Sequence, residues 1–277
     1  MNQKTIKEFF DDNYNQFSKE TVRAYSIALT QFFSHCEKPL NEVKAKDIRA
    51  WMASMTEEGL KPRSIQLKLV AVKSFYTYCL EENIVKQSPA KRVRSPQKED
   101  SLPRYISRQQ LALLREWTLD DVRERAIVEA LYTTGVRISE LLNIRLEDIK
   151  WESRQIWIRK SKNGHERFVS FTSACMVRMK AYLDTRTMES DYLFCNQRGQ
   201  PLSQCLVQQR FREYSTALGF KVTPHTMRHT FATDLTIKGM EDVYLQDYLG
   251  HANLNSTSIY TRLRSVDQRR EYDRYNS

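Results

Sequence analysis

A proline-spaced segment in the first half of the chain separates two parts with different patterns of apolar residues. The segment, Val85–Ser107, contains three prolines and almost no apolar periodicity. Prolines hold a chain extended, so such a segment is typical of a linker, with a solvated loop as the alternative. The sequence therefore predicts two domains, residues 1–95 and residues 107–277, joined by a linker at residues 96–106.

Residues 1–95 read as helical, because apolar side chains recur there at three- and four-residue steps. Ser18 is placed to cap the first of three predicted helices, which stops before Pro39. The second runs from about Ala45 to Glu58, and the third opens at Pro62, where a missing N–H costs nothing. The apolar stripes of these helices predict the core of a small helical domain.

The chain is strongly basic, with a net charge of +10 and a pI of about 9.3. Residues 1–98 hold 17 Lys and Arg against 11 Asp and Glu, so both parts of the chain are positive. Such charge attracts a polyanion over long range, and nucleic acid is the expected partner. Six basic side chains are expected to contact the phosphate backbone: Arg63, Lys68, Lys73, Lys91, Arg92 and Arg94.

Several classes of protein are disfavoured by the sequence. No run of about 18 or more apolar residues occurs and no signal-peptide core is found, which predicts a cytoplasmic, nucleoid-associated protein with no membrane partner. The five cysteines form no C-x-x-C pair, which argues against a zinc site or a disulfide framework. No glycine-rich phosphate loop of the ATPase kind is found. We therefore expect neither a metal nor a cofactor.

The clearest β signal is a hairpin in the second part of the chain. Residues 155–159 and 166–171 alternate apolar and polar side chains, and Asn163-Gly164 between them is a strong turn signal. Lys162 lies at the predicted tip, two residues after Lys160. A tip lysine is usually just solvated, although a flexible tip can also bring an ammonium to a substrate. Helices are predicted at about residues 107–117, 120–133, 173–184 and 203–218, which makes the fold class mainly α with a small β-hairpin or sheet.

A glycine break precedes two charged residues of interest. Gly135 interrupts the helical pattern just before Arg137 and Glu140, which stand three residues apart. An exposed ion pair of little energetic weight is the usual explanation of this spacing. An arginine just after a glycine break can, alternatively, be held in a cleft.

Near the end of the chain, anion-binding side chains open a predicted helix. Thr223 is a suitable N-cap and a proline follows it, so His225 and Arg228 share one face of the first turn. Free N–H groups and the positive end of the helix dipole favour an anion there, most naturally a phosphate. A second helix is predicted from Glu241 to Leu249. It is followed by His251 and, nine residues later, by Tyr260.

Four separated pieces stand in a fixed order: Arg137 in TTGVRISELL, Lys162 on the hairpin, His225-x-x-Arg228 in TPHTMRHTFAT, and His251 in LGH with Tyr260 following. Together they resemble the tyrosine recombinase (phage integrase) family. In size and layout the chain is most similar to Xer-type recombinases and transposon-borne resolvases. The resemblance covers nearly the whole chain, and it implies a helical N-terminal core-binding (SAM-like) domain followed by a mixed α/β catalytic domain.

The resemblance also implies an activity, the site-specific cutting and rejoining of double-stranded DNA through a 3′-phosphotyrosine and a Holliday junction. Two guanidiniums can neutralise the charge that develops on phosphorus without a metal, and the phosphotyrosine conserves the bond energy without ATP. Glu140 matches the acidic position that orients the first arginine. The implied catalytic set is Arg137, Lys162 as general acid, His225, Arg228, His251 and the nucleophile Tyr260.

Other functions remain open at this point. A catalytically idle DNA-binding regulator on the same fold, a type IB topoisomerase and a phage-type integrase are the alternatives. The resemblance implies a homotetramer on two recombination sites, with a C-terminal helix that docks on a neighbouring subunit and possible help from a partner recombinase or an accessory protein. The sequence specifies neither the target DNA nor the choice between a chromosomal, phage or transposon role, and it leaves Lys160 as a rival to Lys162.

Tyrosines near Tyr260 compete for the role of nucleophile. Tyr244 and Tyr248 stand four apart in the predicted helix at residues 241–249, so we expect them to pack against its neighbours. Tyr272 and Tyr275 lie in a charged tail, far in sequence from any anion-binding group. Tyr260 is therefore the predicted nucleophile.

Overall fold

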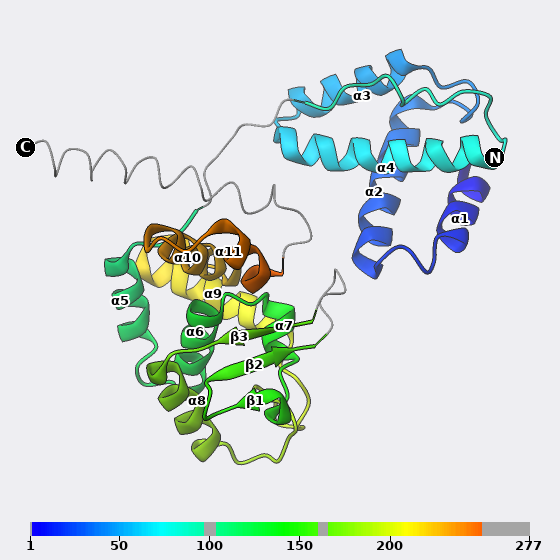
Figure 1. Ribbon diagram of the computed structural model, residues 1–277. Coiled ribbons are helices and arrows are strands. Elements are labelled where there is room, and N and C mark those ends of the chain that lie inside the picture. The colour runs from blue at the N-terminus through cyan, green and yellow to red at the C-terminus, as the bar shows by residue number, and fades with distance from the viewer. Residues whose placement is uncertain (1, 97–103, 160–165, 251–277) are drawn as a thin grey trace, which may run out of the picture. The chain divides into compact units, whose positions relative to one another are not determined.

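A computed structural model describes residues 2–96, 104–159 and 166–250 (Figure 1). The chain divides into two compact units, Met1–Ser101 and Leu102–Ser277. The first unit is helical, and the second is helical with a three-stranded sheet, as the predicted fold class requires. In the described parts of the chain, no helix has both the length and the apolar character needed to cross a membrane.

Four helices form the first unit. Ser18 caps the second of them with its hydroxyl, which accepts a hydrogen bond from the Thr21 N–H at 3.2 Å, as the sequence predicts. Proline opens the last helix, also as predicted. The core combines aliphatic and aromatic side chains, with Phe32, Phe75 and Tyr76 fully buried. The helices are α1 (Asn2–Asp12), α2 (Lys19–Cys36), α3 (Ala45–Glu57) and α4 (Pro62–Glu81).

The sequence analysis missed α1, because few apolar residues mark its buried face. The contacts that hold it come from distant residues: the Phe9 ring packs on Phe75 and Tyr78. The Asn2 side chain also accepts a hydrogen bond from the backbone N–H of Leu40 at 3.0 Å. A helix this short depends on such packing rather than on intrinsic propensity.

The first half of the proline-spaced segment is not a loose linker. Val85, Ala90 and Val93 are buried in the core of the first unit. Their apolar side chains are widely spaced, so they give no periodic signal, yet they cover the end of the helical core. The N-terminal part of Val85–Ser107 therefore packs with the first unit, inside the predicted domain of residues 1–95, and the linker at residues 96–106 remains a prediction.

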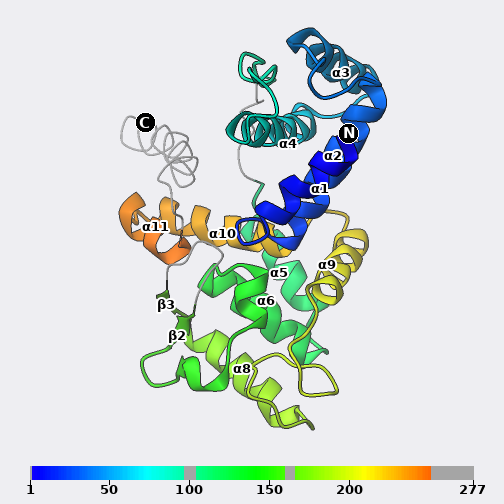
Figure 2. The ribbon, with the colours of Figure 1, turned by 90° about the vertical axis from the view of Figure 1, so that its right-hand side faces the viewer.

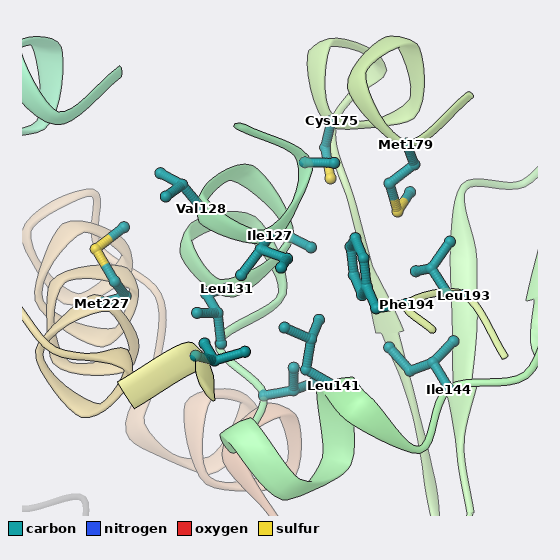
Figure 3. Packing of buried hydrophobic residues seen from close by; sticks show 14 of the residues in the cluster. Ile127, Val128, Leu131, Leu141, Ile144, Cys175, Met179, Leu193, Phe194 and Met227 are labelled. Carbon is teal, nitrogen blue, oxygen red and sulfur yellow. The ribbon is translucent and has the colours of Figure 1, made fainter. Parts of the chain in front are cut away.

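The second unit is built around a buried helix, α6. Figure 3 shows Ile127 and Leu131 of α6 among side chains from its neighbours, including Met179 and Met227. Phe194, from the segment after α8, fills the same core. The helices of this unit are α5 (Arg108–Trp117), α6 (Val122–Thr134), α7 (Ile138–Leu142), α8 (Ser173–Thr185), α9 (Gln204–Leu218), α10 (Pro224–Ile237) and α11 (Asp242–Leu249), with a 3-10 turn, η1 (Leu146–Asp148).

The sheet is antiparallel with strand order β1-β2-β3, where β1 is Ile149–Lys150, β2 is Gln155–Ile158 and β3 is Arg167–Ser170. The predicted hairpin forms β2 and β3, and its register pairs Ile156 with Val169 and Ile158 with Arg167. The two-residue strand β1 was not predicted, because it is too short to show alternation. Helix α11 packs against both α10 and β3, as Figure 2 shows.

Candidate active site

Gly135 has a left-handed backbone conformation, and the turn that it makes positions Arg137, the first predicted site arginine. Gly135 ends α6 at φ 62°, and a Cβ there would lie 2.2 Å from the Cδ1 atom of Phe231 in α10. Glycine is therefore required both by the backbone conformation and by the close approach of α10. The next turn places Arg137 at the N-cap of α7.

Arg137 is held by the carboxylate of Glu140. Its backbone N–H donates to Oε2 of Glu140 at 2.9 Å, and its guanidinium Nη1 donates to Oε1 at 2.9 Å. Nη2 donates to the carbonyl oxygen of Gly250 at 3.2 Å. The guanidinium is thus fixed on one side by a carboxylate and on another by the backbone that follows α11.

The predicted pair is not the exposed ion pair that its spacing first suggests. The Glu140 side chain is only 5% exposed and that of Arg137 is 28% exposed. Burial by itself raises the pKa of the Glu140 carboxyl, but hydrogen bonds and charge from Arg167 and then Arg137 outweigh burial and hold the pKa below its usual value. Glu140 is therefore ionised at neutral pH and holds Arg137 through two hydrogen bonds, while its orienting role in catalysis remains a prediction.

Arg228 comes from the first turns of α10. The helix is capped as predicted, since Oγ1 of Thr223 accepts a hydrogen bond from the Thr226 N–H at 2.9 Å. Arg228 is 4% exposed, and it donates to the carbonyl of Gly135 at 2.7 Å and to that of Leu249 at 2.6 Å. One guanidinium therefore ties the end of α6 to the end of α11.

The two predicted arginines meet at one place, the C-terminal end of α11. Arg228 binds the Leu249 carbonyl and Arg137 binds the adjacent Gly250 carbonyl. Helix C-termini carry unsatisfied carbonyls and a negative dipole end, which guanidiniums stabilise. The structure thus brings together two arginines that lie 91 positions apart in sequence. The carbonyls that they bind belong to the two residues directly before His251 in the sequence.

Arg167 belongs to this cluster, although the sequence analysis did not identify it. It begins β3, its side chain is 8% exposed, and it donates to both carboxylate oxygens of Glu140. A usable signal was present, since in the alternating run Arg167–Phe171 the arginine shares the inward face with Val169. A charged residue at an inward strand position requires a buried partner.

His225 has a second histidine beside it. His225 and His229 are one helical turn apart on α10, and their Nε2 atoms lie 2.9 Å from each other. Burial, then the charges of His225 and Arg228, lower the pKa of His229 to about 4. His229 is therefore neutral at neutral pH, and its ring orients the more exposed His225. The i, i+4 spacing of two histidines was the sequence signal for this contact.

Three predicted site residues, Lys162, His251 and Tyr260, lie outside the described residues, as do Tyr272 and Tyr275. The roles of all predicted site residues remain predictions. Of the two tyrosines expected to pack, Tyr248 does so against Phe231, and its hydroxyl donates to Ser170 Oγ at 2.9 Å. Tyr244 is 61% exposed, so its predicted packing was wrong, because it lies on the outer face of α11.

The six predicted DNA-contacting side chains all lie in the first unit. Arg63 is exposed and Lys68 and Lys73 are half-buried, while Lys91, Arg92 and Arg94 are exposed after α4. Lys68 also donates to the side-chain oxygen of Gln31. Within residues 2–96, 104–159 and 166–250, no three His, Cys, Asp or Glu side chains gather as a metal site would require.

Comparison with known proteins agrees with this geometry. Residues 105–266 match the phage integrase family, and residues 6–83 match the phage integrase N-terminal SAM-like domain. The chain is 34% identical to the tyrosine recombinase XerA of Pyrococcus furiosus over 263 residues, which covers 94% of this chain and 89% of that one.

Two solved structures share the fold. One is the XerH site-specific recombinase bound to a palindromic difH substrate, with 21% identity, a TM-score of 0.78 and coverage of 92% of this chain and 80% of that one. The other is a lambda integrase tetramer bound to a Holliday junction, with 16% identity, a TM-score of 0.77 and coverage of 93% and 76%. The chain therefore belongs to the phage integrase family and is an enzyme, a tyrosine recombinase of the Xer type.

Proposed function

We propose that this enzyme recombines duplex DNA at specific sites through a 3′-phosphotyrosine at Tyr260 and a Holliday junction. The observation that carries the proposal is the convergence of Arg137 and Arg228 on the last carbonyls of α11, immediately before His251. In the proposed complex the two guanidiniums bind one phosphate, and the chain that follows Gly250 in sequence supplies Tyr260 to it.

In the proposed cleavage step, the Tyr260 phenol oxygen attacks phosphorus and the bond to the 5′-oxygen breaks. Arg137 and Arg228 bind the nonbridging oxygens, where negative charge develops. Lys162 protonates the leaving 5′-oxygen, and His225 accepts the phenol proton or binds the phosphate while His251 hydrogen-bonds it. Attack by a 5′-hydroxyl reverses these steps and restores the diester and the free tyrosine.

A nicked suicide substrate tests the proposal. The half-site would first be selected from a random duplex library by the purified protein. Cleavage next to the nick releases a short fragment, which cannot religate, so the wild-type protein should accumulate as a covalent adduct on a denaturing gel. Binding without an adduct would instead indicate a DNA-binding regulator.

For the biological role we propose Xer-like recombination or resolution of transposon cointegrates, carried out at the nucleoid in the cytoplasm. The support is the XerA relative, which matches this chain over nearly its whole length. We also propose a homotetramer on two sites, because the lambda integrase neighbour was solved as a tetramer on a Holliday junction. Excision of a marked segment between two selected sites would distinguish intramolecular resolution from integration.

Binding to the selected site should depend steeply on salt. Both parts of the chain are positive, and neutralised phosphates release counterions, so we expect affinity to fall by about 10³-fold between about 50 and about 200 mM salt. Fluorescence anisotropy with a labelled half-site measures this. An affinity that barely changes over that range would contradict extensive phosphate contact.

Removing residues 267–277 should separate binding from recombination. The proposed docking of this tail on a neighbouring subunit predicts near wild-type binding to one half-site and loss of recombination between two full sites. A gel-shift assay and a two-plasmid recombination assay measure the two quantities. Recombination at the wild-type level by the shortened chain would contradict the docking role.

A further inference from the structure

Arg167 joins three parts of the second unit through one guanidinium. Its Nη2 donates to Oε2 of Glu140 at 2.8 Å and its Nη1 donates to Oε1 at 3.2 Å. Its Nε donates to the backbone carbonyl of Tyr248 in α11 at 2.7 Å. The planar fork of arginine makes these bonds from three nitrogens at fixed positions, whereas the three N–H groups of an ammonium share one nitrogen and do not reproduce that spacing.

Glu140 connects Arg167 to the site arginine. Both carboxylate oxygens that accept from Arg167 also accept from Arg137, one from its backbone and one from its guanidinium. The carboxylate is nearly excluded from solvent, so its position is set by these two arginines. A displacement of Arg167 would therefore be transmitted to Arg137.

The end of α11 fits closely against the same guanidinium. Gly250 adopts φ 59°, and a Cβ added there would lie 2.8 Å from Nη1 of Arg167 and 3.0 Å from its Cζ. Arg167 thus contacts α11 through the Tyr248 carbonyl and faces Gly250, whose own carbonyl accepts from Arg137.

Arg167 also lies at the start of β3, the strand that follows residues 160–165. In the proposed mechanism those residues carry the hairpin lysine, while the residues after Gly250 carry His251 and the nucleophile. The arginine therefore sits where the strand leaving the hairpin, the Glu140–Arg137 pair and the end of α11 meet.

We propose that Arg167 is a positioning residue for DNA cleavage, which sets Arg137 through Glu140 and holds the end of α11 through the Tyr248 carbonyl. The inference rests on the proposed function. It assigns Arg167 no contact with DNA and no part in proton transfer. Its loss should therefore lower the rate of cleavage far more than the affinity for DNA.

Two substitutions, Arg167→Lys and Arg167→Met, separate the effect of the contacts with Glu140 and the Tyr248 carbonyl from the effect of the positive charge. Lysine retains a cation for Glu140 but cannot also bind the Tyr248 carbonyl, so single-turnover cleavage of the suicide substrate should slow by about 10- to 100-fold, the cost of a misplacement of about 1 Å. Methionine removes the cation as well, and a larger loss is expected. Half-site affinity should stay within about threefold of wild type in both variants, because no phosphate contact is removed.

The pH dependence of cleavage provides a readout that a purely structural defect would not produce. Without Arg167, Arg137 is the one cation among residues 2–96, 104–159 and 166–250 that is recorded at hydrogen-bond distance from the buried Glu140 carboxylate, and Arg228 of α10 contacts the nearby Gly135 carbonyl. The pKa of Glu140 should rise, so the acid limb of the rate profile should move to higher pH by about one unit or more in Arg167→Met. The limb should stay in place in Arg167→Lys, whose ammonium keeps Glu140 ionised.

The matched control is Arg125→Lys. Arg125 is also a buried arginine of this unit, 11% exposed and 3.4 Å from Glu129, but it lies at the start of α6. The Arg125→Lys protein should cleave at the wild-type rate. All variants are compared below the thermal unfolding midpoint of the least stable one; should Arg167→Met not fold, Arg167→Lys decides. Failure of the wild-type protein to form an adduct would contradict the proposed function, whereas wild-type cleavage with an equally fast Arg167→Lys would overturn this inference alone.

Discussion

Tyr260→Phe should form no covalent adduct with the suicide substrate while binding the half-site as tightly as the wild-type protein. The change removes only the hydroxyl that is proposed to attack phosphorus, so the loss should be at least about 10³-fold, as expected when an enzyme nucleophile is removed. The ring is retained, and so is every arginine that is proposed to bind phosphate. Denaturing gels measure the adduct and anisotropy measures binding.

Tyr248→Phe is the matched control for this experiment. Tyr248 lies two residues before Gly250, and its hydroxyl donates to Ser170, so its loss should cost about 1 kcal/mol of stability and leave the adduct in place. Tyr244→Phe, on the exposed face of α11, should change neither quantity. An adduct formed by the Tyr260→Phe protein, with the phosphotyrosine mapped to another residue, would show that the nucleophile is misassigned.

Arg228→Ala should lower both cleavage and stability. The guanidinium is buried and binds the carbonyls of Gly135 and Leu249, so its removal leaves two buried acceptors without their donor. We expect about 3 kcal/mol of destabilisation, since each such group costs about 1–3 kcal/mol. Cleavage should fall by about 10³-fold, because the variant also lacks a proposed donor to the developing phosphate charge. Urea unfolding and single-turnover cleavage measure the two effects.

A second arginine controls for the structural part of this loss. Arg186 also donates to two backbone carbonyls, those of Tyr192 at 2.7 Å and Ser190 at 3.0 Å, but it lies at the C-terminal end of α8, away from the cluster. Arg186→Ala should destabilise the protein and leave the cleavage rate of the folded fraction unchanged. Equal cleavage defects in the two variants, after correction for the fraction of folded protein, would contradict the proposed phosphate-binding role of Arg228.

The sequence was sufficient for features that depend on local chemistry. The Ser18 and Thr223 caps, the proline at the start of α4 and the alternation that predicts strands β2 and β3 all depend on a few neighbouring residues, so they can be predicted without knowledge of the rest of the fold. The order of the arginines, histidines and tyrosine was likewise enough to indicate the family.

The contacts that join the site required the folded chain. The sequence does not show that Arg137 and Arg228 converge on the end of α11, because these groups lie on separate elements. Nor does it show that Arg167 forms an ion pair with Glu140. The same holds for α1 and for the Val85–Val93 segment, which are held by packing against distant side chains. Local propensity acts over a few bonds, whereas burial and charge pairing depend on which distant residues the core brings together, and this is why they appear only in three dimensions.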